Sequence, residues 1–289
     1  MEAHIAYINQ NLSENSQLCH ASNLIVKINK FNTLKDKQKR ALKEIVEKYH
    51  AYIKANNKLV GYDDCTIVKR VELLNNYYNF IHENDYDNIF SSQGKLRPTI
   101  LEEFIFLLFR DYVKDIKESY DDQCNALHSG AAKAYTNLYF TSSCFENFLK
   151  EPSIEVNVKN QDFAIYRDFD LIVNGNKKNI KIPIVAVEDK TYIDKTMLEG
   201  IIATAEKIKT GNPYSMFIVI TENYDVDLAV DPAYSRIDQI YVLRKCKRKE
   251  SWTNIDCDVV KRIFHDVKNH IDRPWSNVEE KMRNEGVII

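Results

Sequence analysis

Residues 185–200, VAVEDKTYIDKTMLEG, decide the fold expected for this chain. The run from 180 to 187 is almost continuously apolar and rich in β-branched residues, which is typical of a buried strand. It ends in Glu188 and Lys190, with a second acid, Asp189, between them. Because side chains alternate along a strand, Glu188 and Lys190 fall on one face and Asp189 on the other. The strand is therefore expected to present a carboxylate and an ammonium group side by side at its end.

The same acid-x-Lys spacing occurs three more times, at residues 115–117, 266–268 and 279–281. Each of those copies lies in a helical pattern, where residues two apart diverge around the helix axis. Only the copy at 188–190 has the geometry that brings the two side chains together.

An antiparallel hairpin is expected to supply the neighbouring strand. Residues 163–166 and 171–173 are β-prone, and residues 174–179, NGNKKN, have the composition of a turn. A divalent cation with oxygen ligands normally needs more than one carboxylate. The neighbouring strand offers Asp162, Asp168 and Asp170.

The position of the turn chooses among these three acids. Pairing Asp162 with Glu188 centres the turn on Gly175, whereas pairing Asp170 with Glu188 centres it on Asn179 and leaves the Asn-Gly turn signal unused. Asp162 is therefore expected opposite Glu188, unless a bulge near residues 168–170 alters the register. Asp170 would lie about 26 Å from Asp162 along an extended chain, so the two cannot serve one metal ion.

A modest surface ion pair is the ordinary interpretation of a Glu and a Lys on one sheet face. The position of this pair at the end of a buried run, with Asp162 expected opposite, favours a different interpretation. Inward-facing acids beside an apolar core are costly unless a cation neutralises them. The pattern therefore favours a cation-binding site.

The remaining pattern predicts an α/β chain. Apolar residues recur at helical spacing before residue 90, a strongly apolar helix is expected from Pro98 onward, and residues 127–150 are expected to form another helix. A helix over 196–209 lies between the strand that ends at Lys190 and an apolar strand at 216–221, and residues 239–243 read as a further strand. This order predicts a mixed sheet with a parallel crossover. We expect a helical subdomain over residues 1–94 and a second domain over residues 95–289.

Composition sets the broad class of the protein. The 289 residues are 44% hydrophobic and 28% charged, with a formal net charge of −2, as in an ordinary soluble globular protein rather than a globally basic nucleic-acid binder. The start of the chain lacks the layout of a signal peptide, so we expect a cytoplasmic protein without membrane contact. The six cysteines form no C-x-x-C pair, and no Walker loop or G-x-G-x-x-G motif supports a nucleotide enzyme.

An Asp on one strand followed by Glu-x-Lys at the end of the next resembles the PD-(D/E)XK nuclease pattern. The segments NQDFAIY (160–166), PIVAVEDKTYIDKTMLEG (183–200) and RPTILEEF (97–104) are more closely similar to type II restriction endonucleases, in the group that includes heterodimeric enzymes cutting CCTNAGC-like sites. The resemblance covers about residues 95–245. Members of the group more often have an uncharged residue where Asp189 stands, which leaves its part in metal binding open.

The resemblance implies a PD-(D/E)XK nuclease core, αβββαβ, with a mixed central sheet, and a Mg²⁺-dependent reaction. Asp162, Glu188 and Lys190 would be catalytic: Asp162 and Glu188 would hold Mg²⁺, and Lys190 would orient a water molecule or offset charge in the transition state. Supporting positions would be Glu103, Tyr192 and Lys195, each of which is also consistent with a plain surface role.

Double-stranded DNA is the implied partner, and a basic cluster around the last expected strand suits phosphate contacts. The cluster also suits a solvated edge that discourages strand pairing. The DNA-binding candidates are Arg236, Gln239, Arg244 and Lys245. One active site cuts one strand, so cleavage of both strands implies a homodimer or a heterodimer with a related subunit. The alternatives are a repair or recombination nuclease with the same core, and a DNA-binding subunit without catalysis.

Overall fold

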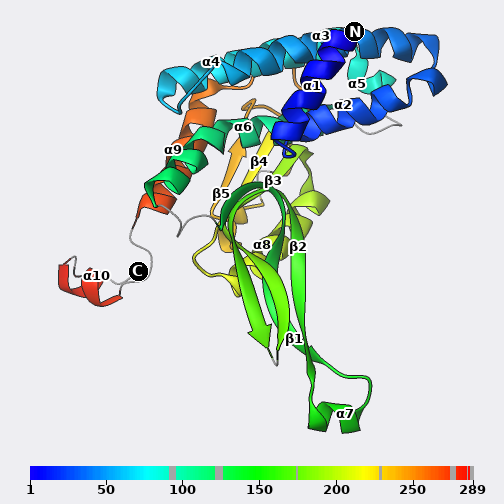
Figure 1. Ribbon diagram of the computed structural model, residues 1–289. Helices are drawn as coiled ribbons and strands as arrows, with labels where there is room; N and C mark the ends of the chain where they lie inside the picture. Colours follow the sequence, from blue (N-terminus) through cyan, green and yellow to red (C-terminus); the bar gives the residue numbers. More distant parts are fainter. Residues whose placement is uncertain are drawn as a thin grey trace.

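The computed structural model describes residues 1–90, 96–120, 126–173, 175–227, 230–273, 278–284 and 286. Helices fill the N-terminal part, and a five-stranded sheet follows them (Figure 1). The helices are α1 (Glu2–Glu14), α2 (Cys19–Asn29), α3 (Asp36–Asn57), α4 (Asp64–Glu83), α5 (Tyr86–Ile89), α6 (Leu96–Ser119), α7 (Phe145–Lys150), α8 (Lys195–Gly211), α9 (Cys257–Asp272) and α10 (Val278–Asn284). The strands are β1 (Leu127–Thr141), β2 (Ser153–Val173), β3 (Asn176–Ile193), β4 (Met216–Tyr224) and β5 (Gln239–Val242).

The sheet is mixed, with spatial order β1-β2-β3-β4-β5. The pairs β1–β2 and β2–β3 are antiparallel, while β3–β4 and β4–β5 are parallel. Helix α6 precedes the first three strands and α8 joins β3 to β4, so the element order is αβββαβ with β5 added at the edge. This confirms the expected α/β nuclease core with a helical N-terminal region.

Each face of the sheet has its own hydrophobic core. On one face, Val185, Val187 and Ile218 join a large core that also contains side chains of α3, α4, α6 and α9. On the other, Ala186 and Phe217 pack against α8. The expected alternation is therefore confirmed over residues 185–187 of β3, because Val185 and Val187 enter one core and Ala186 enters the other.

The register of the β2–β3 hairpin is the one that the turn argument requires near the proposed site. Val173 pairs with Asn176, and Gly175, at φ +76°, directly precedes β3. The pairing shifts between Ile165 and Tyr166, whose partners are Val185 and Pro183. A bulge does occur, but it lies nearer the site than residues 168–170. Beyond it, Phe163 pairs with Val187, which leads Asp162 toward Glu188.

The prediction of a helix over residues 127–150 is wrong. Residues 127–141 form β1, and only residues 145–150 are helical. The alanines around position 132 favour a helix, yet burial alternates strictly from Gly130 to Thr136, because this segment is an edge strand paired along its length with β2. Tertiary pairing therefore overrides local helix propensity here.

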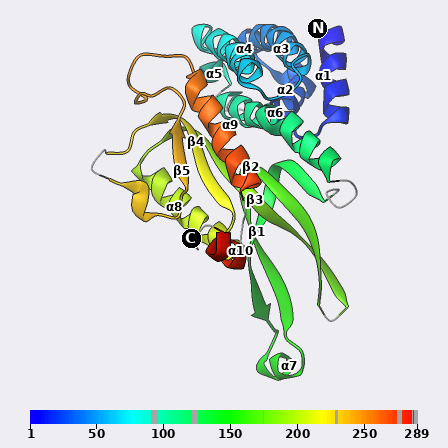
Figure 2. The same ribbon diagram turned by 90° about the vertical axis from the view of Figure 1, so that its left-hand side faces the viewer.

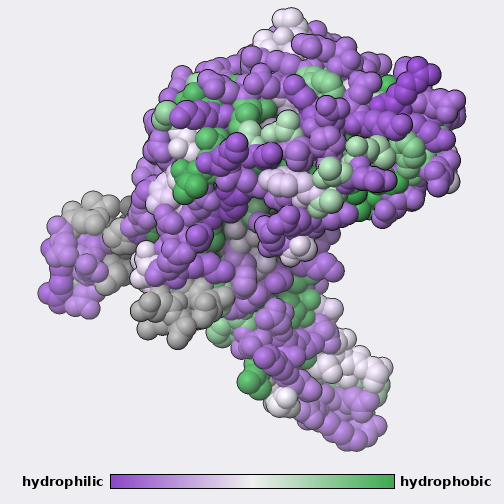
Figure 3. Space-filling view, turned by 45° about the horizontal axis from the view of Figure 1, so that its top comes forward, coloured by the Kyte–Doolittle hydropathy of each residue, from purple (hydrophilic) through white to green (hydrophobic). Residues whose placement is uncertain are grey.

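Strands β1, β2 and β3 extend beyond the body as an arm that carries α7 at its tip (Figures 1 and 2). The space-filling view shows a surface that is mostly hydrophilic, with hydrophobic side chains in separate patches over the helical part and along the arm (Figure 3). Among the described residues, no helix is long and apolar enough to cross a bilayer.

A glycine at the end of α8 lets this helix approach β1. A Cβ atom on Gly211 would lie 2.3 Å from the carbonyl oxygen of Thr136, a backbone atom that cannot move aside cheaply. We expect Gly211→Ala to lower the free energy of unfolding by about 1–3 kcal/mol in urea titrations. Gly200, in the same helix, has no atom within 4 Å of the added Cβ, so Gly200→Ala is the matched control and should raise it by about 0.5–1 kcal/mol. Equal effects of the two substitutions would contradict the packing argument.

Candidate active site

The three side chains expected to converge do so at the end of the β2–β3 pair. Lys190 Nζ donates to Asp162 Oδ2 at 2.9 Å and to Glu188 Oε2 at 2.9 Å. It also donates to the backbone oxygen of Asp189 at 2.9 Å. The backbone N–H of Asp189 donates to Asp162 Oδ2 at 2.8 Å, which ties the two strands together at this point. Three oxygen atoms from two strands therefore surround one cationic group.

The charges of this cluster are strongly coupled. Burial raises the pKa of Glu188, the ammonium group of Lys190 opposes this shift, and Asp162 adds to it. Burial alone would lower the pKa of Lys190, but Asp162 and Glu188 together outweigh burial, and the pKa of Lys190 is raised. Lys190 is therefore protonated at neutral pH, and its charge offsets the carboxylates.

The oxygen atoms around Lys190 Nζ are of the types that a hard divalent cation prefers, two carboxylates and one backbone carbonyl. The ammonium nitrogen stands where such a cation would have to lie to reach all three. Within the described part of the chain, no group of three or more His, Cys, Asp or Glu side chains is arranged to hold a metal ion. The oxygen atoms that the protein presents at this point are those of two carboxylates and one backbone carbonyl.

The other acids of this region take different positions. The side chain of Asp189 is buried, and neither of its carboxylate oxygens has a hydrogen-bond partner among the described residues. Burial, followed by the charges of Asp162 and Glu102, raises the pKa of Asp189 well above its ordinary value. Asp170 lies near the hairpin turn, where it pairs with Lys177 at 2.8 Å. Neither side chain shares the cluster around Lys190, although the backbone of Asp189 does.

Helix α6 brings Glu102, rather than Glu103, toward the cluster. Burial raises the pKa of Glu102 to about 7, with a further contribution from Asp162 and an opposing one from Lys190. Glu103 faces the helical part instead: it accepts from the backbone N–H of Ala21 at 3.0 Å and from Tyr49 Oη at 2.8 Å. Sequence reasoning selected Glu103 and missed Glu102, because α6 is buried on almost all sides and its apolar pattern does not separate two adjacent acids.

The buried position of Glu103 has a consequence for stability. Burial raises the pKa of Glu103 from 4.5 to about 7, so the folded state holds a proton that the unfolded chain has already released. The free energy of unfolding should therefore fall as the pH rises from about 4.5 to about 7, by up to about 1.4 kcal/mol per pH unit from this group. Glu103→Gln should remove that contribution, measured as urea unfolding at several pH values.

The matched control for this prediction is Glu199→Gln, which changes an exposed glutamate on α8. It should leave the pH dependence of stability close to that of the unaltered protein. A Glu103→Gln variant that keeps the full pH dependence would show that Glu103 is not the titrating group.

The sequence-based DNA-binding candidates divide into exposed and buried residues. Arg236 and Gln239 are exposed, and so is Lys245, which pairs with Asp256 at 2.6 Å. Lys195 is exposed at the start of α8. Arg244 is different: its side chain is buried and its Nε donates to Glu222 at 2.8 Å, so the structure does not place it on the surface. Its place beside Trp252, 3.7 Å from Cζ to the ring centroid, is structural.

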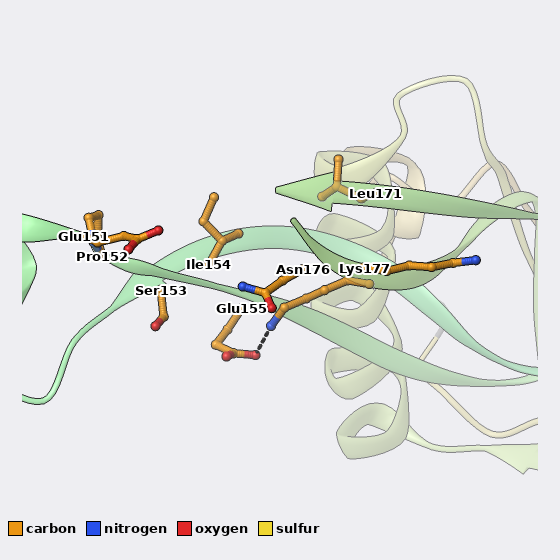
Figure 4. Close-up of a pocket in the computed structure, with 9 residues that line it drawn as sticks. Glu151, Pro152, Ser153, Ile154, Glu155, Leu171, Asn176 and Lys177 are labelled. Carbon is orange, nitrogen blue, oxygen red and sulfur yellow. Dashed lines mark hydrogen bonds and ion pairs between the residues drawn. The ribbon is translucent and has the colours of Figure 1, made fainter. Parts of the chain in front are cut away.

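A separate cavity lies away from the cluster around Lys190. One hollow of about 500 Å³ lies on the arm, where Ile154, Glu155, Leu171 and Asn176 line it (Figure 4). Lys178 pairs there with Glu155 at 2.7 Å. This hollow contains none of the three clustered side chains, so it is not the candidate active site.

The sheet, the two helices and the Asp on β2 with Glu-x-Lys on β3 together define the class of PD-(D/E)XK nucleases. The chain belongs to the Bpu10I restriction endonuclease family, whose model matches residues 93–273. It is thus a type II restriction endonuclease, an enzyme that cuts DNA at specific sites.

One solved structure described as "native BbvCI A2B2 tetramer at low resolution" supports the fold. The match has a TM-score of 0.68 and 21% sequence identity, and it covers 90% of this chain and 99% of that chain. A comparison with curated protein sequences gives no match.

Proposed function

We propose that Asp162, Glu188 and Lys190 are the catalytic residues and that the enzyme requires Mg²⁺, held by Asp162 and Glu188. The observation that carries this proposal is the enclosure of one ammonium group by Asp162 Oδ2, Glu188 Oε2 and the backbone oxygen of Asp189. Oxygen ligands of these types suit a hard divalent cation. When bound, such a cation would polarise the scissile phosphate and acidify a water molecule.

The protein's own groups would have separate tasks. Lys190, which is protonated, would donate to the attacking water or to a phosphoryl oxygen that gains charge in the transition state. The charge of Asp162 raises the pKa of Glu102 and of the buried Asp189, so these acids repel one another. A bound cation would relieve this repulsion. The product is expected to carry a 5′ phosphate.

We also propose a two-subunit enzyme, with recognition of a CCTNAGC-like site. One active site cuts one DNA strand, so cleavage of both strands needs two sites. The structurally similar BbvCI is described as an A2B2 tetramer, which supports a heterodimeric unit over a homodimer.

We propose further that residues 1–94 form a helical subdomain and residues 95–289 the nuclease domain. The half-buried Tyr192 and the exposed Lys195, next to the site, are proposed to face the DNA.

A plasmid digest tests the proposal. Plasmids with and without CCTNAGC-like sites would be incubated with the protein and Mg²⁺, with EDTA as the control. Discrete fragments or nicks confined to the plasmid with such sites would support it. Smearing, or cutting without regard to sequence, would contradict the site-specific function.

A further inference from the structure

A polar cavity of about 210 Å³ lies directly beside the candidate active site. Its walls come from five separate segments of the sequence: α5, the start of α6, the end of β3, the end of β4 and the loop after β5. The lining residues that matter here are Arg97, Thr191, Tyr192 and Arg248.

The position of the cavity is set by β3. Thr191 and Tyr192 directly follow Lys190 in this strand. At about 3.3 Å per residue, the cavity begins roughly 3–7 Å beyond Lys190. Successive phosphates of one DNA strand are about 3.4 Å apart along the duplex axis. A duplex with its scissile phosphate at Lys190, and with the cleaved strand running along β3, would bring another phosphate of the same strand to the cavity.

The guanidinium group of Arg248 stacks on a neighbouring aromatic ring, which positions it for a phosphate. Its Cζ lies 4.0 Å from the ring centroid of Tyr192, and its backbone N–H donates to Asp225 Oδ1 at 2.8 Å. Among the described residues, no carboxylate forms an ion pair with its exposed guanidinium group. A guanidinium stacked on an aromatic ring keeps its N–H edges for a planar or tetrahedral anion, and stacking limits the entropy lost on binding.

Arg97 supplies a second guanidinium group to the lining of the cavity. Its Nη2 donates to the buried Glu222, and its Nε lies 3.8 Å from Asp87 Oδ2. Asp87 is the acid among the described lining residues, and its Oδ1 accepts from the backbone N–H groups of Leu96 and Arg97 at 3.3 Å. Glu222 also pairs with the buried Arg244. Among the described lining residues, Arg97 and Arg248 carry positive charge and Asp87 carries negative charge, so the lining keeps one net positive charge.

We propose that this cavity binds a backbone phosphate of the DNA, one or two nucleotides from the cleaved bond, between Arg248 and Arg97. Tyr192 acts as a positioning residue that orients Arg248. The inference rests on the proposed function and deepens it, because it assigns a phosphate subsite next to the catalytic residues. Because Arg248 is exposed, substitutions there can remove or keep its positive charge without disturbing the buried core.

The test is the salt dependence of DNA binding by the full chain in Ca²⁺. A fluorescein-labelled 30-base-pair duplex would be titrated at several salt concentrations with the unaltered protein, Arg248→Ala, Arg248→Lys and Arg262→Ala. Arg262 is an exposed arginine on α9 that does not line the cavity, so its removal is the matched loss of one charge. Plasmid cleavage in Mg²⁺ would be followed in parallel.

Arg248→Ala should reduce the slope of log affinity against log salt by about 0.9, the value for one phosphate contact, and weaken binding about tenfold. Arg248→Lys should restore the slope but only part of the affinity. Arg262→Ala should leave both unchanged. If Arg248→Ala behaves as Arg262→Ala does while the unaltered protein binds and cuts DNA, the subsite is wrong and the nuclease assignment stands. An unaltered protein that neither binds nor cuts DNA overturns both.

Discussion

Replacing Glu188 with glutamine is expected to lower the rate of DNA cleavage by about a thousandfold, while duplex binding stays within a fewfold of the unaltered protein. The substitution keeps the size of the side chain but removes the negative charge that would hold a cation. It also removes one of the two carboxylates that Lys190 contacts, since Glu188 Oε2 lies 2.9 Å from Lys190 Nζ. Lys190→Met should have a comparable effect, because it removes the ammonium group that contacts both carboxylates.

Cleavage would be measured as plasmid nicking in Mg²⁺, and binding as fluorescence anisotropy of a labelled duplex in Ca²⁺. Lys207→Ala, an exposed lysine on α8, is the matched control and should cut normally. Loss of binding together with cleavage would point to misfolding or to a role in DNA affinity. Undiminished cleavage by Glu188→Gln would place the catalytic centre elsewhere.

Replacing Glu222 with alanine should lower the free energy of unfolding by about 3–5 kcal/mol. Glu222 lies at the end of β4, is 0% exposed, and accepts from Arg97 Nη2 and from Arg244 Nε. The side chain of Arg244 is 1% exposed, so the alanine variant would leave a buried guanidinium charge without its carboxylate. Urea unfolding followed by circular dichroism would measure the loss.

The exposed ion pair between Arg236 and Glu206, 3.0 Å apart, provides the comparison. Glu206 is 48% exposed, and Glu206→Ala should cost less than about 1 kcal/mol because water screens both partners. Similar losses for the two alanine variants would mean that the buried charges around Glu222 are compensated by other groups. Glu222→Gln should fall between them, since it keeps an acceptor but not the charge.

The hairpin shows how far sequence reasoning reaches when two local signals agree. An apolar run and an Asn-Gly turn together predict which acid on β2 faces Glu188, and the register at Phe163 and Val187 confirms the alignment. The bulge between Ile165 and Tyr166 could not be located in advance. A single extra residue in a strand leaves the local preference for extended backbone unchanged, so it has no signature in composition.

Two side chains show where sequence reasoning stops. Glu102 and Glu103 are adjacent acids in one apolar helix, and only the packing of α6 between β2 and the N-terminal helices sends one toward Asp162 and the other toward Tyr49. Arg244 lies in a run of basic residues that resembles a surface patch. The structure buries it against Glu222 and Trp252, and no local sequence pattern predicts these contacts.

The sequence by itself determined the buried strand, its exit in Glu-x-Lys and the turn that aligns Asp162, because side-chain alternation and turn preferences act over a few neighbouring residues. Only the tertiary structure decided that residues 127–141 form a strand and that Glu102 approaches the site. It also brought Arg97 and Arg248 together beside Lys190. The physical reason is that each of these outcomes depends on contacts between segments tens of residues or more apart. The energies of such contacts outweigh local propensities, which are a few tenths of a kcal/mol per residue, roughly.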